Sequence, residues 1–273
     1  MKKIILIFVV AILALSCNKE SEEENDVKIN IIVNDSILYN GVKTEISANV
    51  NQTVEAITFY IDGKNIGSIS ESNFSIEYTP KNLKAGNHIL KCTATSLKGK
   101  IFKNEKTIKC VLRLGDTFEG GNIFHLGKSG EHGLISSNED FAANSNNGEL
   151  TEFQYGCYNK FLEAKSEDGK LNTSKMAENS TNQNEIGYYF KTELTYNGYS
   201  DWYIPSEMEL NLLRDNMQYV EGFIYDQNHS MNNYYWSSTE AYLYEARALN
   251  MFVMAGNQQD KLKYLKVRLI RKF

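Results

Sequence analysis

Short segments in which polar and apolar residues alternate fill the chain from Val27 to Leu112 and predict β-strands. Alternation puts every second side chain on one face of a sheet, where it can be buried. Turn residues separate the segments, and Asp62-Gly63 is a two-residue hairpin signal. Because no helical pattern interrupts them, we expect an antiparallel β-sandwich. The predicted strands are 27–33, 43–50, 56–63, 65–70, 74–79, 88–96 and 106–114.

Residues 113–273 differ in composition from the preceding part, because fourteen of the seventeen Tyr and both Trp lie there. A β-hairpin is predicted first, with its turn at Gly127 to Gly130, and the polar stretch 138–150 follows as a surface loop. Helical and strand-like patterns then follow in mixed order, which indicates an α+β domain. The predicted helices lie near 173–180 and 184–194, and the predicted strands are 234–238, 244–253 and 262–272.

The stretch YSDWYIPSEMEL, at 199–210, predicts the start of another helix. Pro205 precedes Ser206, and Ser206 and Glu209 have the spacing of a capping box, in which each side chain accepts a hydrogen bond from the other residue's backbone N–H. Trp202 is expected to pack on the sheet. These residues therefore receive structural roles.

Asp201 needs a partner if it is buried beside these aromatic rings, because an unpaired buried charge is costly. Alternation along the last predicted strand places Arg271 on the same side as its inward-facing apolar residues. An inward-facing Arg needs a carboxylate. We therefore expect Arg271 to pair with Asp201 or with Glu240.

The N-terminus carries a leader pattern, in which two lysines precede an unbroken apolar run from Ile4 to Leu15. The run is shorter than the ~20 residues that a membrane-spanning helix needs, so we interpret residues 1–16 as a signal peptide. Ser16-Cys17 resembles the lipobox of bacterial lipoproteins. The resemblance implies that Cys17 is lipidated and holds the protein at a membrane.

Residues 17–26 are rich in Glu and Asp, so they predict a solvated tether. An acidic stretch after a lipidated cysteine also resembles the export signal of surface lipoproteins in some Gram-negative bacteria. The implied location is the outer membrane, on the cell surface, with the periplasmic side as the alternative.

Charge and cysteine content exclude several classes. The 29 Lys and Arg minus the two of the leader leave 27 against 34 Asp and Glu, a formal net charge of −7 after residue 16. A nucleic-acid binder needs a basic face, so nucleic acid is not an expected partner. Three cysteines remain beyond Cys17, which is not a disulfide framework. Whether Cys92 and Cys110 are bonded stays open.

No pattern indicates catalysis, a cofactor or a metal site. The stretch GNIFHLGKS has neither the spacing nor the following helix of a phosphate loop. No GxSxG elbow occurs, and Cys157 has no recognisable His partner. His125 and His132 flank one turn without a third ligand of recognisable spacing. We therefore expect a protein that is not an enzyme.

Two resemblances to known families add to this interpretation. The segments FYIDGKNIG, at 59–67, and GNHIL, at 86–90, resemble bacterial Ig-like modules, which implies an Ig-like spacer over 27–112. Over 113–273, the segments GDTFEGGNIFHLGKSGEHGLISS, NGYSDWYIPSEMELNLL, YYWSSTE and VRLIRKF closely resemble the Lcl C-terminal domain family.

The Lcl family is named after a bacterial collagen-like adhesin that binds glycosaminoglycans. The resemblance implies a C-type-lectin-like α+β fold after the Ig-like sandwich, in a mainly β chain. The calcium-dependent sugar triads of true C-type lectins are missing, so calcium-dependent sugar binding has little support.

These patterns favour a surface lipoprotein whose C-terminal domain binds an extracellular ligand. A glycan is preferred, because Tyr and Trp rings can stack on sugars and the basic segment 261–272 offers contact with an anionic polymer. The alternative is a protein-binding or structural component without a sugar site, and the oligomeric state stays open. The ligand contacts expected from the lectin-like fold are Trp236, Glu240, Arg247, Asn250 and Arg268.

Overall fold

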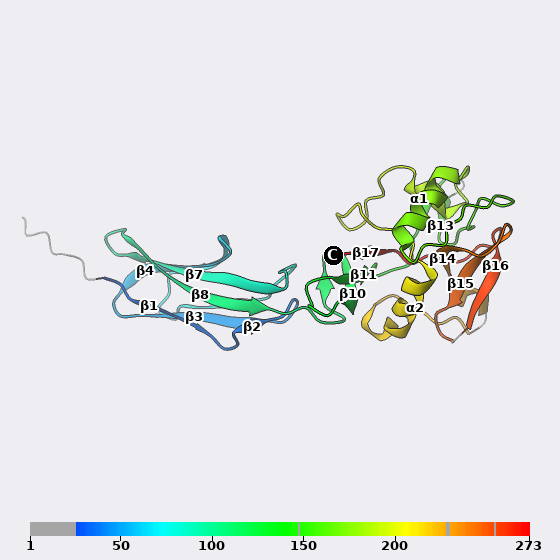
Figure 1. The fold of residues 1–273 in the computed structure, drawn as a ribbon. Coiled ribbons are helices and arrows are strands. Elements are labelled where there is room, and N and C mark those ends of the chain that lie inside the picture. The colour runs from blue at the N-terminus through cyan, green and yellow to red at the C-terminus, as the bar shows by residue number, and fades with distance from the viewer. Residues whose placement is uncertain (1–25, 147, 228–229, 254) are drawn as a thin grey trace, which may run out of the picture.

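The structure is a computed structural model that describes residues 26–146, 148–227, 230–253 and 255–273. The predicted signal peptide, Cys17 and all of the predicted tether except Asp26 lie outside the described residues. The molecule is elongated, with an all-β part at one end and a part of mixed helices and sheets at the other (Figure 1). No helix among the described residues is long and apolar enough to cross a membrane.

Two sheets form the N-terminal sandwich, which comprises β1 to β8. All seven predicted strands are present with shifted ends, and β2 is an additional short strand that pairs in parallel with β8. The other pairings are antiparallel. One sheet contains β1 (Ile29–Val33), β3 (Thr44–Val50) and β6 (Ser75–Tyr78); the other contains β2 (Ile37–Leu38), β8 (Ile101–Cys110), β7 (Gly86–Ser96), β4 (Val54–Ile61) and β5 (Lys64–Ile69).

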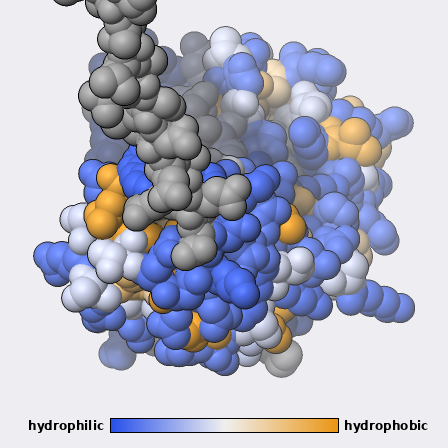
Figure 2. Space-filling model, turned by 90° about the vertical axis from the view of Figure 1, so that its left-hand side faces the viewer, coloured by the Kyte–Doolittle hydropathy of each residue, from blue (hydrophilic) through white to orange (hydrophobic). Residues whose placement is uncertain are grey.

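The alternating pattern of the sequence places one face of each sheet in a shared core. Ile57, Phe59 and Ile61 of β4 are buried there, together with Ile46 from the other sheet. Removing such apolar area from water is the main favourable term in folding. Viewed from this end of the molecule, the surface is mostly hydrophilic, with hydrophobic residues in small scattered areas (Figure 2).

Cys92 and Cys110 face inward, but both are free thiols. Across the β7–β8 ladder Cys92 faces Asn104, whereas Cys110 faces Gly86 at a distant rung. Burial raises the pKa of Cys92 to about 12 and that of Cys110 to about 11. The disulfide between Cys92 and Cys110 that the sequence left open is therefore absent. Alternation predicts which face of the sheet a cysteine lies on, but not its distance from another cysteine.

Two small sheets and a hairpin frame the C-terminal part, which comprises β9 to β17. The last strand, β17, pairs with β11, so segments from both ends of this part share one sheet. The first sheet contains β17 (Ile270–Lys272), β11 (Gly133–Ser136), β10 (Gly121–Leu126) and β9 (Thr117–Phe118); the second contains β14 (Tyr234–Glu240), β15 (Glu245–Asn250) and β16 (Ala255–Asp260); the hairpin is β12 (Ala143–Ser145) and β13 (Gly148–Leu150).

The helices differ in extent from the prediction. α1 (Gly169–Asn179) begins earlier than expected because Asp168 caps it, its carboxylate accepting a hydrogen bond from the Lys170 N–H at 3.0 Å. The helix predicted at 184–194 is only the short 3₁₀ helix η1 (Ile186–Phe190). The remaining helices are α2 (Glu207–Asp215), η2 (Met217–Tyr219) and η3 (Ser230–Asn233).

One loop prediction and one strand prediction were wrong in extent. The predicted loop 138–150 contains the hairpin β12–β13, and the predicted strand 262–272 is in a sheet only at β17. The segment 265–269 instead runs through the core, with isolated bridges to Phe153 and Tyr235. Val267, Arg268 and Leu269 are all buried. A segment buried on both sides does not follow the alternation from which its strand was predicted.

Candidate ligand-binding site

The stretch 199–210 holds the start of α2 in place. The Ser206 hydroxyl accepts a hydrogen bond from the Glu209 N–H at 3.2 Å, and the Glu209 carboxylate accepts one from the Ser206 N–H at 2.9 Å. The predicted capping box is therefore present. Glu209 also accepts from the Gly169 N–H at 3.0 Å, which ties α2 to the start of α1. Pro205 and Trp202 are buried beside it.

Arg271 pairs with Asp201, one of the two carboxylates that the sequence offered. Its Nε and Nη2 donate to the two carboxylate oxygens at 2.6 and 3.1 Å, and its Nη1 donates to Glu119 Oε2 at 3.0 Å. The guanidinium lies over the Tyr199 ring at 4.2 Å. Partial burial opposes ionisation of Asp201, but the hydrogen bonds and charge of Arg271 outweigh it and lower the pKa of that carboxyl.

The ligand contacts expected from the lectin-like resemblance do not form a surface. Trp236 and Arg268 have no exposed area, and Glu240 and Asn250 are also buried. Only Arg247 is partly exposed, where its Nε lies 3.6 Å from a Glu207 carboxylate oxygen. These four residues are not accessible to a ligand in this structure, because they lie in the core rather than at a rim.

The basic segment 261–272 is exposed only in part, because Lys263 and Lys272 face solvent whereas Lys261 and Arg268 are buried. Lys261 is fully buried, and its Nζ lies 2.6 Å from Glu240 Oε1. The Glu240 carboxylate also accepts hydrogen bonds from the backbone N–H groups of Leu162 and Glu163. Arg268 donates to Asp140 at 2.7 and 3.0 Å. These cations are neutralised inside the protein, so they offer nothing to an anionic polymer.

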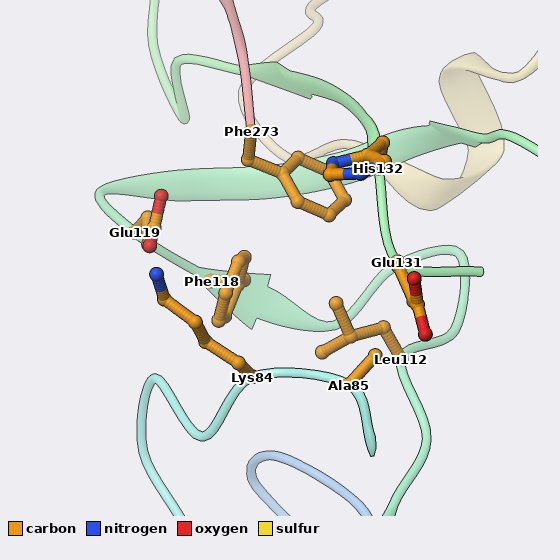
Figure 3. Close-up of a pocket in the computed structure, with 8 residues that line it drawn as sticks. All are labelled: Lys84, Ala85, Leu112, Phe118, Glu119, Glu131, His132 and Phe273. Atoms are coloured by element: carbon orange, nitrogen blue, oxygen red, sulfur yellow. The ribbon is translucent and has the colours of Figure 1, made fainter. Parts of the chain in front are cut away.

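One cavity of about 520 Å³ lies where the two parts of the chain meet (Figure 3). Ala85 and Leu112, from the chain that flanks the sandwich, and Phe118 and Phe273 line it with apolar surface. Nearby, the Glu119 N–H donates to Asn82 Oδ1 at 2.7 Å and joins the two parts. The lining contains a cation, Lys84, and two carboxylates, Glu119 and Glu131, so the cavity does not favour a ligand of one charge. His132 also lines it.

A polar groove runs beside α1 and forms the best candidate for a ligand site. Two adjoining hollows, of about 430 and 500 Å³, share Ser174, Phe190 and Lys191 in their walls. Gly187 lets η1 approach α1 closely, because a Cβ there would collide with Ser180 and with the backbone of Met176. We call this feature the α1 groove. Its other lining residues are Lys170, Thr173, Ala177, Glu178, Thr192, Glu193, Leu194, Ser200, Asp201, Trp202 and Tyr203.

Two elements supply the walls of the α1 groove. Lys170, Ser174 and Glu178 recur every four residues, so they lie in one row along α1. Opposite them, Phe190 rests on the core ring of Phe141 with their ring centroids 6.5 Å apart. The groove therefore combines an anchored aromatic ring with a row of exposed polar side chains.

Four polar side chains of the α1 groove are free for a ligand. Over the residues that the structure describes, the side chains of Glu178, Thr192, Glu193 and Ser200 form no hydrogen bond. A third hollow of about 410 Å³ lies beyond the C-terminal end of α1, and Tyr188 lines it with amide and hydroxyl side chains. Its remaining lining residues are Ser145, Asn146, Thr181, Asn182, Gln183 and Asn184.

Sequence reasoning missed every residue of this site except Asp201 and Trp202, which it had assigned to structure. The only signals were the helical patterns near 173–180 and 184–194, which gave no indication that the two segments face each other. No group of three or more His, Cys, Asp or Glu suited to a metal ion occurs in the part of the chain that the structure describes. The groove offers donors, acceptors and rings rather than a metal centre.

A family model described as a bacterial Ig domain matches residues 18–91. The N-terminal part is a bacterial Ig-like domain. The sandwich extends beyond the match, because the end of β7 and all of β8 follow residue 91. The resemblance of residues 113–273 to the Lcl C-terminal domain family stays a prediction, and no curated protein matches the chain.

Solved structures give only distant similarities. Fibronectin(III)-like modules of Clostridium thermocellum CbhA are 19% identical, with a TM-score of 0.28, and the match covers 31% of this chain and 98% of that one. The Bacteroides ovatus mixed-linkage glucan utilization locus protein SGBP-B, in complex with a heptasaccharide, is 18% identical with a TM-score of 0.27. This match covers 46% of the present chain and 39% of the SGBP-B chain. Scores this low carry no argument about function.

Proposed function

We propose that this protein binds a glycan chain in the α1 groove and acts in capture or adhesion outside the cell. The observation that carries the proposal is the groove itself, which places the Phe190 ring between the exposed polar row of α1 and the segment that follows η1. Sugars present apolar C–H faces together with many hydroxyl groups. A site with both aromatic and two-way hydrogen-bonding side chains matches this chemistry.

The dimensions favour a chain over a single sugar. α1 contains 11 residues, and a helix rises by about 1.5 Å per residue, so the groove wall is roughly 16 Å long. The hollow beside Tyr188 prolongs it. Both signs of charge line the groove, through Lys170, Lys191, Glu178 and Glu193. A neutral or weakly charged oligosaccharide therefore fits better than a highly charged polymer.

The location belongs to the same proposal. Lipidation of Cys17 would hold the N-terminus at the outer membrane, and the Ig-like domain would space the α1 groove away from it. The groove lies in the C-terminal part, and the sandwich lies between it and the first described residue (Figure 1). This order along the molecule suits a binding domain presented on a stalk.

A glycan array probed with the chain from residue 18 onward tests the proposal. The variant Lys191→Ala/Thr192→Ala removes two exposed groove side chains, and we expect it to weaken binding about tenfold, which corresponds to ~1.4 kcal/mol. Phe161→Ala, which removes an exposed ring elsewhere, is the matched control. Binding that is absent for the wild type, or unchanged in the groove variant, would overturn the assignment.

A second function, protein binding, is favoured by a separate observation. Several large apolar and aromatic side chains are exposed around the turn between β14 and β15, outside the α1 groove. Exposed apolar surface of this kind marks interaction sites.

A further inference from the structure

Seven large exposed side chains lie in three turns, at 158–161, 242–244 and 262–264, that meet at Lys261. We call this surface the tyrosine tip. The exposed fractions are 61% for Tyr242, 46% for Tyr244 and 44% for Tyr264, so about half of each side chain is in contact with solvent. The complete set is Tyr158, Phe161, Tyr242, Leu243, Tyr244, Leu262 and Tyr264.

The buried Lys261 holds the turns of the tyrosine tip together. Its Nζ donates to the carbonyl oxygens of Lys160 and Leu243, both at 3.0 Å, and to Glu240 at 2.6 Å. Above it, the rings of Tyr158 and Tyr244 lie with centroids 5.0 Å apart. Three turns that are far apart in sequence therefore converge on one fixed cation, and the tip is preformed.

The tyrosines of the tip differ from those of the core. The core hydroxyls of Tyr155, Tyr203 and Tyr235 each donate a hydrogen bond to an acceptor within the protein. Throughout the described chain, by contrast, the hydroxyls of Tyr158, Tyr242, Tyr244 and Tyr264 have no hydrogen-bond partner. Tyrosine is enriched in the centres of protein interfaces because its ring is buried while its hydroxyl finds a partner.

The size of the tip fits a protein interface. If a fully exposed side chain of this kind has about 200 Å², the exposed fractions of the seven residues amount to roughly 600 Å². A stable interface buries about 800 Å² per partner, so the tip alone supplies most of the area that such an interface needs.

The segments that carry the tip hold equal numbers of cations and carboxylates. Three lysines and three carboxylates lie in the segments that carry it, and Glu245 and Asp260 are directly opposite each other in the β15–β16 ladder. In a two-fold contact each surface meets its own copy, so a balanced border allows cations to meet carboxylates. The six charged residues are Lys160, Glu163, Lys165, Glu245, Asp260 and Lys263.

We propose that the tyrosine tip binds the tip of a second copy of this chain. β15 and β16 lie at the end of the molecule opposite the Ig-like sandwich (Figure 1). A tip-to-tip dimer therefore places the two sandwiches at its far ends, pointing away from each other. Two copies held on opposed surfaces can join in this way, which is homophilic adhesion and does not require the α1 groove.

Sedimentation equilibrium of the chain from residue 18 onward, which keeps every described residue, tests the dimer. We expect a reversible dimer, and we expect Tyr242→Ser/Tyr244→Ser to raise its dissociation constant about tenfold or more. Tyr225→Ser is the matched control, because Tyr225 is 53% exposed but lies outside the tip. A second measurement uses Tyr242→Cys, which should cross-link two copies under mild oxidation.

Four outcomes would overturn the proposal. The first two are a wild type that stays monomeric at high concentration and a dimer that persists in Tyr242→Ser/Tyr244→Ser. The third is a control variant, Tyr225→Ser, that weakens the dimer equally. The fourth is a monomer that instead binds vesicles of anionic phospholipid through the tip. The groove variant Lys191→Ala/Thr192→Ala should keep the dimer, and the tip variant should keep glycan binding. Failure of one proposal is thus distinguishable from failure of the other.

Discussion

Replacing Lys261 by Met is the sharpest test of how the C-terminal part is stabilised. The side chains of Lys261 and Glu240 have no exposed area, and their charged atoms lie 2.6 Å apart. The variant leaves the carboxylate buried without its cation, and it also removes the donor that two backbone carbonyl oxygens share. Removing one partner of a buried pair costs about 3–5 kcal/mol.

The expected loss lies near the lower end of that range, at about 3 kcal/mol, because Glu240 keeps the N–H groups of Leu162 and Glu163. For a part of this size the loss corresponds to a decrease of roughly 6–12 °C in Tm. Both Trp residues, Trp202 and Trp236, lie in the C-terminal part. Tryptophan fluorescence during urea unfolding therefore reports on this part alone.

Lys272→Met is the matched control. Lys272 lies 2.9 Å from Asp168, but the two side chains are 51% and 37% exposed, and exposed pairs contribute about 0–1 kcal/mol. In Lys261→Met/Glu240→Gln both charges are gone, so its loss should be smaller than the sum of the two single losses. A loss below about 1 kcal/mol for Lys261→Met, equal to that of the control, would refute the reasoning.

Three further predictions concern other contacts. The pKa of Asp201 is lowered in the folded protein, so its ion pair stabilises the fold at pH values above the unfolded pKa of about 3.9. This stability is lost as the pH falls through the folded pKa. Asp201→Asn should therefore unfold more easily at neutral pH, and its Tm should decline less steeply in acid. Burial raises the pKa of Cys92, Cys110 and Cys157, so mass spectrometry should find them unalkylated at pH 8 until the protein unfolds. Gly187→Ala should cost about 1–3 kcal/mol by forcing η1 away from α1, whereas Gly256→Ala, which has room for a Cβ, should cost much less in the same unfolding assay.

The Ig-like sandwich and the start of α2 were predictable because local patterns determine them. Alternation identified seven strands, and the spacing of Ser206 and Glu209 identified the capping box. The pairing of Arg271 with Asp201 also followed, since an inward-facing cation needs a nearby acid. The buried Lys261 and Arg268 did not follow, because a basic segment is normally solvated and nothing local marks the acids that neutralise it.

The candidate site was not predictable for a related reason. The α1 groove arises from two segments that meet only in the tertiary structure, and the close approach of η1 depends on the single missing side chain of Gly187. The tyrosine tip likewise collects residues from three separate turns around Lys261. Composition showed that the C-terminal part is rich in Tyr, but only the structure shows which of these tyrosines are buried and which are exposed.

The pairing of β17 with β11 has a consequence for the order of synthesis. The residues from Arg268 to Lys272 supply the partners of Asp201, of Asp140 and of the edge of β11. While the chain is being synthesised, the Ig-like sandwich can fold as soon as β8 emerges. The C-terminal part lacks these contacts until its last residues arrive, so its apolar segments stay exposed for longer.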